Sequence, residues 1–373
     1  MPQRRPAVLS AISMTAILLT VAGSATPAMA AQPITCGMTV TTNITLTRDL
    51  TCPGPGLIIG ADNVTIDLGG HTLAGAGPAA STDIGIRAEG HANLRIQRGT
   101  ITGFRQAVEL YEVRNAFLRG LRITGNAPLT DRLARIGTLS LYYSENIDVR
   151  DSHVVQPQDT TSLFTESVKS MRMERVQFGG SFVWTYSTYV SVTRSAISDG
   201  DLDFFSTFGV EVRDNVLRRS GVGVSEASAV ITDNHFTGPM RIAINLAITN
   251  GPVVERNTIT GAVYGVNIDV PVVRDARIQN NVFRDNDYGV VLTERDLIGE
   301  NLFIADNLFT GNRQAGIFFE AERIAGRNTP LTVTRNTFIR NGHGSTDTDS
   351  AGRRIDDGIH TNLPVGSLLT ISH

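Results

Sequence analysis

Apolar residues recur at alternate positions on both sides of a turn residue along most of this 373-residue chain. The stretch "VERNTITGAVYGVNID", residues 254–269, shows one unit: an asparagine between two alternating runs, a loop, and a glycine that opens a further run. Twelve units align on a turn residue, here called the anchor: His71, Gly99, Leu121, Ser152, Val176, Ser195, Asn215, Asn234, Asn257, Asn281, Asn307 and Asn336. The residue three before each anchor and the residue two after it are always apolar, although only 41% of the chain is hydrophobic.

This pattern predicts two short strands that meet at a sharp corner, followed by a third strand after a variable loop. Each unit is then one three-sided coil. Coils of about 20 to 30 residues without a helix-period segment stack into a parallel solenoid rather than a βαβ sheet. Asparagine suits the corner because it tolerates left-handed backbone angles and because stacked carboxamides hydrogen-bond from coil to coil. Twelve coils at ~4.8 Å each predict a stack of roughly 55 to 60 Å.

The N-terminus has the features of a secretory signal peptide. Arg4 and Arg5 precede an apolar stretch over residues 7–22, and Ala28-Met29-Ala30 supplies a small-x-small cleavage site. We therefore expect residues 1–30 to be a signal peptide and residues 31–373 to form a single domain of a secreted, extracellular protein. The twin arginine also resembles an alternative export signal, but this match is less complete than the match to a secretory signal peptide. No later apolar run is long enough to span a bilayer, so no membrane contact is expected.

Composition narrows the class of protein further. The 36 glycines and a charged content of 18% are typical of a globular, turn-rich chain. The formal net charge is -3 and Lys169 is the only lysine, so we see no basic stripe and expect no nucleic acid as a partner. In an oxidising compartment Cys36 and Cys52 are expected to pair and to pin an N-terminal cap, with two free thiols or a metal site as alternatives.

The repeats, together with "CGMTVTTNITLTRDLTCPGPGLIIGADNVTIDLGGHTLAG" at residues 36–75, resemble the pectate-lyase-like right-handed parallel β-helix superfamily in its exported actinobacterial form. The resemblance implies an all-β, single-stranded right-handed parallel β-helix of about twelve or more coils. The superfamily contains polysaccharide lyases, hydrolases of uronic-acid polymers, uronate epimerases and members without an assigned activity. It implies an acidic polysaccharide as partner, which the protein cleaves or epimerises. A non-catalytic carbohydrate-binding or cell-wall rod is the alternative.

Two long loops lead into third strands, at residues 125–137 and 341–357, and are expected to wall a cleft between them. Eleven of the aromatic residues lie between Tyr142 and Phe208. If the small apolar residue of "FVWTYSTY" points into the core, strict alternation places Trp184 and Tyr186 on the outer surface. There their rings can stack on sugar faces. The alternative is that these aromatic residues stack in the core.

The acidic run "SDGDLDFF" lies next to these rings. Asp199, Asp201 and Asp203 stand at alternating positions, where three carboxylates can converge on a calcium ion that bridges to a uronate substrate. They can instead act as acid and base in hydrolysis, or form a solvated turn. Arg219 and Arg241, in loops taken as equivalent, are candidates for stabilising an enolate-like intermediate and for removing the proton, because lysine is lacking. Solvated loop arginines are the alternative.

His153 follows Asp151 by two residues, a carboxylate-x-histidine pairing that uronate epimerases of this superfamily also display. The alternative is that both residues flank a corner. Ser225, Asn245 and Asn267 are taken to occupy matching outward positions on successive third strands, where they bind sugar hydroxyls or form a polar ladder without a ligand.

The last coil is unfinished in this pattern. Leu369 and Ile371 match the apolar positions five and three before an anchor, and that anchor would fall just beyond His373. A bare final coil presents unpaired backbone groups beside an apolar end. We therefore expect either that the natural product continues past His373 or that this end contacts another chain.

Overall fold

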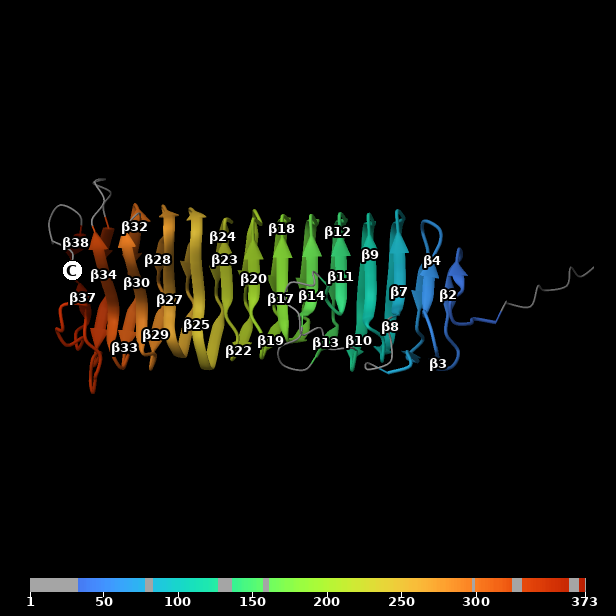
Figure 1. Cartoon of the computed structure of the whole chain (residues 1–373), viewed down its shortest axis with the longest axis horizontal. Coiled ribbons are helices and arrows are strands. Elements are labelled where there is room, and N and C mark those ends of the chain that lie inside the picture. The colour runs from blue at the N-terminus through green and yellow to red at the C-terminus, as the bar shows by residue number, and fades with distance from the viewer. Residues whose placement is uncertain are drawn as a thin grey trace, which may run out of the picture. The chain divides into compact units, whose positions relative to one another are not determined.

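The computed structural model describes residues 33–77, 83–126, 136–156, 161–296, 299–323, 331–361 and 369–372. The predicted signal peptide, residues 1–30, and the middle of the loop at 125–137 lie outside these ranges. The regular elements of the described residues are strands, and the strands of successive coils pair in parallel (Figure 1). No helix in the described part is long and apolar enough to cross a membrane.

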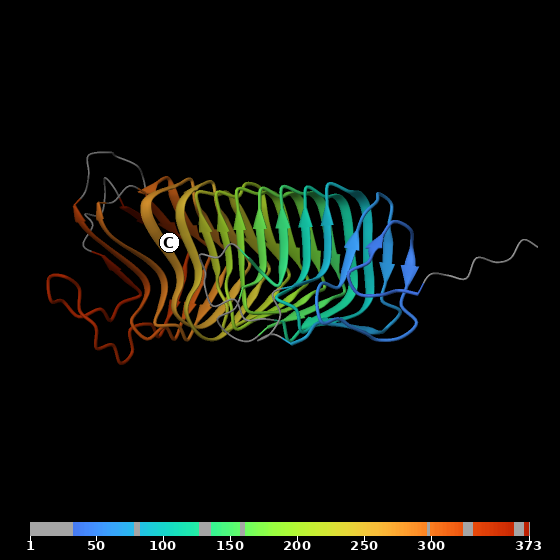
Figure 2. The ribbon, with the colours of Figure 1, turned by 45° about the vertical axis from the view of Figure 1, so that its right-hand side comes forward.

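The chain winds through three stacks of strands, called here the first, second and third sheets in the order in which each coil visits them (Figure 2). The first sheet contains β1 (Thr39–Val40), β4 (Leu57–Ile59), β7 (Ile84–Glu89), β9 (Gln106–Tyr111), β11 (Leu139–Tyr142), β14 (Thr161–Glu166), β17 (Ser181–Thr185), β20 (Leu202–Phe205), β23 (Val222–Ser225), the later parts of β25 (His235–Asn250) and β27 (Thr258–Arg274), β30 (Tyr288–Asp296), β34 (Ala315–Arg323) and β37 (Ile359–Thr361).

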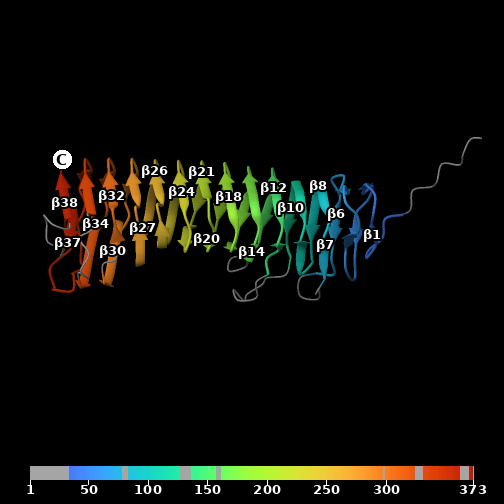
Figure 3. The ribbon, with the colours of Figure 1, turned by 90° about the horizontal axis from the view of Figure 1, so that it is seen from above.

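The second sheet contains β2 (Ile44–Thr45), β5 (Thr65–Asp67), the first halves of β8 (Ala92–Thr102) and β10 (Arg114–Thr124), β12 (Glu145–Arg150), β15 (Lys169–Glu174), β18 (Thr188–Thr193), β21 (Val210–Arg213), β24 (Ala229–Thr232), β26 (Val253–Glu255), β28 (Arg277–Gln279), β32 (Leu302–Ala305), β35 (Leu331–Thr334) and β38 (Leu369–Ser372). Figure 3 shows several of these strands side by side.

The third sheet contains β3 (Leu50–Thr51), β6 (Thr72–Ala74), the second halves of β8 and β10, β13 (His153–Val155), β16 (Gln177–Gly179), β19 (Ala196–Ser198), β22 (Val216–Arg218), the starts of β25 and β27, β29 (Val282–Arg284), β33 (Leu308–Thr310) and β36 (Thr337–Ile339). The short β31 (Gly299–Glu300) pairs with the end of β27. The predicted three-sided coil and the expectation of about twelve or more coils are confirmed.

The core fills the space between the three sheets. The residues two after the anchors form one column in the third sheet, and Phe178, Ile197 and Leu217 in it are each at most 1% exposed. From Ile96 onward the residues three before the anchors form the matching column in the second sheet. In the first aligned coil Ile66 lies beside Ile96, so the predicted place of Leu68 in this column is wrong.

The two corners of the third sheet differ in how much chain they contain. Across the corner from the second sheet, core residues stay five positions apart from Ile96 onward, as in Ile96 and Ile101 or Val333 and Phe338. Across the corner to the first sheet the separation ranges from four positions, Phe178 to Phe182, to 21 positions, Phe338 to Ile359. The long loops therefore belong to the third–first corner. The predicted register of the last coil is confirmed, because Ile371 lies beside Val333.

The backbone turns at the second–third corner through the residue before the anchor. That residue has a positive φ in all twelve units: Gly70, Arg98, Gly120, Asp151, Arg175, Arg194, Asp214, Asp233, Arg256, Asn280, Asp306 and Arg335. The prediction that the anchor asparagines adopt the left-handed conformation is therefore wrong. The anchors from Leu121 to Asn307 are buried instead, and His71, Gly99 and Asn336 are partly buried.

The anchor asparagines form the predicted ladder. Nδ2 of Asn215 donates to Oδ1 of Asn234 at 3.0 Å, and the same bond joins each later pair as far as Asn336. Each Oδ1 also accepts the backbone N–H of the preceding anchor. A second, shorter ladder of Asn286, Asn312 and Asn341 lies at the third–first corner. These bonds leave the buried carboxamides paired, which an apolar interior demands.

The N-terminal coils are joined by a disulfide. Cys36 and Cys52, 16 positions apart, are bonded to each other, and Cys52 is fully buried. The predicted pairing is confirmed, and the alternatives of free thiols and a metal site are excluded for these two residues. A cross-link that closes a loop of this length stabilises a fold by about 3 kcal/mol.

Replacing Asn257 by alanine should lower the free energy of unfolding by about 2 to 4 kcal/mol, because several buried groups lose partners at once. Asn257 donates to the carbonyl of Ile231 and to Oδ1 of Asn281, and its Oδ1 accepts two bonds from Asn234. Urea denaturation followed by circular dichroism measures the change.

The matched control is Asn43→Ala, which removes one exposed hydrogen bond that its Oδ1 accepts from the backbone N–H of Thr65. This change should alter the free energy of unfolding by no more than about 0.5 kcal/mol. Equal effects of the two substitutions would show that the buried ladder does not stabilise the stack.

Candidate functional site

A strip of polar residues runs along the outer side of the first sheet. Asp203, Gly223, Asn245 and Asn267 are register partners on β20, β23, β25 and β27. They face outward because their neighbours in each strand, such as Val222, are buried in the core. Nδ2 of Asn267 donates to Oδ1 of Asn245 at 2.8 Å, so two members of the strip already form a ladder.

Ser225 lies outside this line, two residues further along β23 than Gly223. It pairs with Phe205 and Ala247, whereas Gly223 occupies the position beside Asn245. The prediction that Ser225, Asn245 and Asn267 match is therefore wrong by two residues. A slip of two residues preserves the outward direction of a side chain, so Ser225 still lies on the same face.

Two carboxylates occupy the start of the strip. Oδ1 of Asp201 accepts the backbone N–H of Gly221 at 2.7 Å. Asp203 leans over Gly223, where a Cβ atom would come within 2.5 Å of its Oδ1. The glycines of β23 therefore leave the room in which Asp201 and Asp203 lie on one face, two residues apart.

Asp199 belongs to the corner and not to the strip. It has a φ of 60° and forms a two-pronged ion pair with Arg219, at 2.6 and 2.8 Å. The hydrogen bonds from Arg219 lower the pKa of Asp199. No group of three or more His, Cys, Asp or Glu side chains that could hold a metal is found in the described part of the chain. Asp199 is thus engaged by Arg219 at the corner, and a calcium ion held by Asp199, Asp201 and Asp203 stays a prediction.

The two candidate arginines are not equivalent. Arg219 aligns with Gly238, because Arg218 pairs with Thr237 and Gly238 lies against the Arg219 side chain. Arg241 follows three residues later, in the longer third–first corner of its coil, and is exposed. It forms no hydrogen bond or ion pair with the residues that the structure describes. Arg241 is thus available at the edge of the strip, whereas Arg219 is engaged by Asp199.

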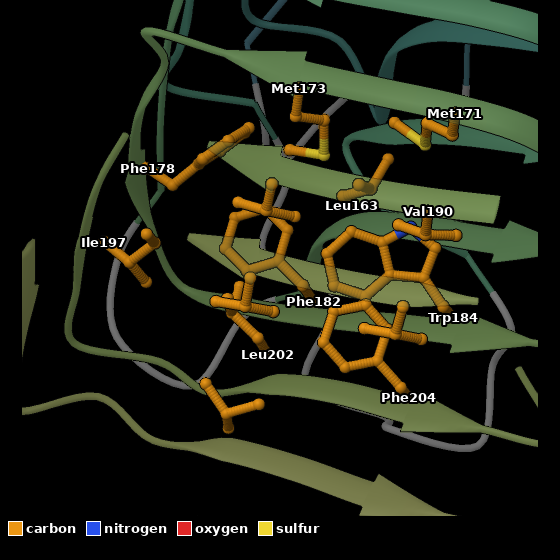
Figure 4. Packing of buried hydrophobic residues seen from close by; sticks show 14 of the residues in the cluster. Leu163, Met171, Met173, Phe178, Phe182, Trp184, Val190, Ile197, Leu202 and Phe204 are labelled. Carbon is orange, nitrogen blue, oxygen red and sulfur yellow. The ribbon is translucent and has the colours of Figure 1, made fainter. Parts of the chain in front are cut away.

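The two aromatic candidates have opposite environments. Trp184 is 0% exposed and stacks on Phe204 with a centroid distance of 4.5 Å, so its predicted exposure is wrong (Figure 4). Tyr186 is 56% exposed, as predicted. Strict alternation fails here because Tyr186 has a φ of 52°, which turns its side chain out of the series formed by Phe182 and Trp184.

Three further aromatic residues are exposed beside Tyr186 and were not singled out by the sequence pattern. Phe205 meets Tyr186 edge to face at 6.0 Å, and Tyr189 and Phe208 lie at the start of the second sheet in the same two coils. All three are more than one-third exposed. They form, with Tyr186, an aromatic rim between the strip and the second sheet.

His153 does not join the strip. It lies on β13 in the third sheet, and its Nδ1 is 2.8 Å from Oε1 of Gln177. Asp151 is the left-handed corner residue before the anchor, and its carboxylate accepts bonds from Arg119 and Arg175. The predicted pairing of Asp151 with His153 is therefore not formed.

The loop at 341–357 packs on the outer side of the first sheet beyond the strip. Ile355 joins Tyr288, Val291 and Phe318 in a small apolar cluster. Beside it, buried Nε2 of His360 lies 3.1 Å from Asp349. This loop walls one end of the strip, as predicted. The two hollows resolved among the described residues lie elsewhere, one on the second sheet around Phe303 and one around residues 340–344.

The comparisons with known proteins agree with this fold. Residues 182–338 match the family model described as right handed beta helix region. A surface adhesin of Streptococcus pneumoniae, PfbA, is similar at 13% identity and a TM-score of 0.53, over 66% of this chain and 79% of that one. An alginate lyase from Paenibacillus sp. is similar at 13% identity and a TM-score of 0.42, over 66% of this chain and 95% of that one.

The A-module of the Azotobacter vinelandii mannuronan C-5 epimerase AlgE4 is similar at 15% identity and a TM-score of 0.39, over 90% of this chain and 91% of that one. No curated protein matches the chain. At such identities a structural likeness shows the fold alone. The coil architecture and the family-model match over residues 182–338 show the right-handed parallel β-helix fold that the sequence predicts.

Replacing Asp199 by asparagine should remove its ion pair with Arg219 and lower the free energy of unfolding at neutral pH by up to about 1 kcal/mol. Because the folded-state pKa of Asp199 is lowered, the pair stabilises above the ordinary carboxyl pKa and is lost as the pH falls through the lowered value. Urea denaturation at neutral and strongly acidic pH measures both effects. Asp201→Asn is the control, because its amide oxygen still accepts the hydrogen bond from the backbone N–H of Gly221. Equal losses of unfolding free energy in the two variants would show that the ion pair of Asp199 does not stabilise the fold.

Acid should release the loop at 341–357. Although burial opposes it, the hydrogen bonds from Arg353 and His360 hold the pKa of Asp349 at about 2. The loop is therefore stabilised at neutral pH and should lose this contribution between about pH 4 and pH 2. Asp349→Asn should speed amide exchange across the loop roughly tenfold at neutral pH. Asp357→Asn, at the exposed second partner of His360, is the control and should change exchange little.

Proposed function

We propose that the protein binds a polysaccharide chain along the strip of the first sheet. The outward side chains of Asp203, Asn245 and Asn267 stand in one line across coils that are ~4.8 Å apart, and Gly223 occupies the coil between Asp203 and Asn245. Their oxygen and N–H groups are suited to sugar hydroxyls, and the rings of Tyr186 and Phe205 beside them are suited to sugar faces. The observation that carries this proposal is the exposed aromatic rim next to a line of outward carboxylates and amides.

We further propose that the reaction at the strip is cleavage, with Asp201 and Asp203 as the acid and base. Hydrolysis of a glycosidic bond needs one carboxylic acid to protonate the leaving oxygen and one carboxylate to activate water or attack the sugar. Both groups lie on one outward face and above glycines, which leaves space for a sugar ring. Arg241 at the edge of the strip supports an acidic sugar as substrate, because a guanidinium binds a carboxylate with two parallel hydrogen bonds.

Elimination and epimerisation of a uronate chain are less well supported by the same residues. Both need positive charge where the substrate carboxylate becomes enolate-like. Arg219 is held by Asp199, and only Arg241 of the two predicted arginines is free to approach.

A non-catalytic, carbohydrate-binding rod is the second candidate. The side chains of Asn245 and Asn267 are joined by a hydrogen bond, as in a ladder that needs no ligand. The similar PfbA is named as an adhesin, which supports a binding role for this architecture. Export to the outside of the cell fits either function, because the Cys36–Cys52 bond is typical of an oxidising compartment.

Replacing either Asp201 or Asp203 by asparagine should reduce cleavage of the substrate polymer by roughly a hundredfold or more, because each loses a proton-transfer group. A panel of uronic-acid and neutral polysaccharides, assayed for reducing ends and for unsaturated-product absorbance, identifies substrate and reaction together. Binding of the polymer and the urea midpoint should stay near those of the wild type.

Asp269→Asn is the matched control, since Asp269 is an exposed acid on the same face two residues beyond Asn267. It should leave cleavage unchanged. Unsaturated products would show elimination instead of hydrolysis, and polymer binding without any product in the wild type would establish the rod.

A further inference from the structure

A row of arginines crosses the N-terminal half of the second sheet where it turns into the third. Five consecutive coils, from β8 to β18, each contribute one: Arg98, Arg119, Arg150, Arg175 and Arg194. Arg172 on the outer face of β15 joins them. Their side chains are 30% to 65% exposed. The strands that carry the row lie side by side in Figure 3.

Positive charge exceeds negative charge within this arginine row. Its six guanidinium groups contact four carboxylates, those of Asp67, Asp148, Asp151 and Glu174. Six positive and four negative groups leave a surplus of two, on a chain whose formal net charge is -3. The expectation from the sequence that no basic stripe exists is therefore wrong. The stripe forms only when the coils stack.

The balance reverses further along the same sheet. In the coils from β21 to β35 the second sheet and its corner carry four arginines: Arg213, Arg256, Arg277 and Arg335. The same positions carry five acids: Glu211, Asp214, Asp233, Glu255 and Asp306. A polyanion would therefore be attracted to one half of the sheet and repelled by the other.

Glu174 organises the centre of the row. Its side chain is 3% exposed and contacts Arg172 at 2.9 Å, Arg175 at 2.6 Å and also Arg194. A carboxylate offers about four acceptor sites, whereas each guanidinium carries five donors. Glu174 is therefore saturated, while the half-exposed arginines around it keep donors that point to solvent. An additional anion would satisfy those donors and reduce the repulsion between the crowded positive charges.

We propose that the arginine row binds a linear acidic polysaccharide laid along the stacking axis. Guanidinium groups on successive coils repeat every ~4.8 Å, so several anionic groups of an extended chain can be bound in turn. Arginine binds carboxylate and sulfate groups with paired hydrogen bonds, which a lysine cannot do. The row lies on a different sheet from the strip, so it holds the polymer whether or not the strip cleaves it.

Nucleic acid is the less favoured polyanion. Single strands are bound largely by stacking bases on exposed aromatic rings. The ring within this surface, Phe117, is covered by the guanidinium groups of Arg95 at 5.1 Å and Arg150 at 5.9 Å. The row therefore offers charge recognition without an exposed ring among its arginines, and the exposed Tyr189 lies at the opposite end of β18 from Arg194.

The test compares two triple variants. R119Q/R172Q/R194Q removes three half-exposed arginines of the row, and R213Q/R256Q/R335Q removes three from the same sheet where acids are in excess. Binding is measured by isothermal titration at low and high salt. The ligands are polygalacturonate, heparin as a sulfated polymer and dextran as a neutral one. The row variant should bind both polyanions roughly tenfold more weakly or worse, with a flatter salt dependence. The control should bind like the wild type.

Relative affinities for the two polyanions distinguish carboxylate from sulfate recognition. Cleavage at the strip should be the same in all three proteins. The urea midpoint of R119Q/R172Q/R194Q should be lower, because the buried carboxylate of Glu174 loses two partners, so the titrations are run well below that midpoint. R119K/R172K/R194K, which keeps the charge, should bind with intermediate affinity and remains usable if the glutamine variant fails to fold. Three results would overturn the proposal: no binding of either polyanion by the wild type, equal losses in the two glutamine triples, or tighter binding of a single-stranded oligonucleotide than of both polysaccharides.

Discussion

Every feature of this molecule depends on backbone groups of one coil bonding to those of the next. Parallel pairing fixes the distance between coils, and the buried corner must then leave no polar group unpaired. The anchor residues meet this demand with side chains that bond along the stack. Ser152 and Ser195 accept the backbone N–H of the preceding anchor with a hydroxyl, and from Asn215 onward a carboxamide does so. Since the stack repeats, each outward position becomes a column, and both proposed binding surfaces are such columns.

The fold could be predicted because its information is local. Two apolar residues five positions apart, with a turn residue between them, describe one corner completely, and the same arrangement recurs in each coil. The disulfide and the register of the last coil, at Ile371, followed from equally short stretches of sequence. The left-handed turn was assigned to the wrong residue, because asparagine is chosen at the anchor for its buried hydrogen bonds and not for its backbone.

The candidate site could be predicted only in part, because it depends on relations between coils. Ser225 was placed beside Asn245 although Gly223 lies there, since an alternating pattern fixes the face of a strand but not its register with the next. Trp184 was placed outside because the left-handed Tyr186 breaks the alternation that the prediction assumed. The arginine row escaped notice entirely, since the arginines that successive coils contribute, from Arg98 to Arg194, are 19 to 31 positions apart in the chain and become neighbours only after stacking.

The unequal corners of the third sheet have a consequence for how such a protein can change over evolutionary time. From Asn215 to Asn336 the second–third corner holds a buried ladder and a constant spacing, so a single inserted residue there would displace core side chains in one coil and break bonds to its neighbours. The third–first corner already accommodates separations from four to 21 positions without altering the stacked core. New loops can therefore be acquired beside the strip while the supporting frame stays the same. Specificity in such a molecule can diversify coil by coil, independently of the sequence that makes it fold.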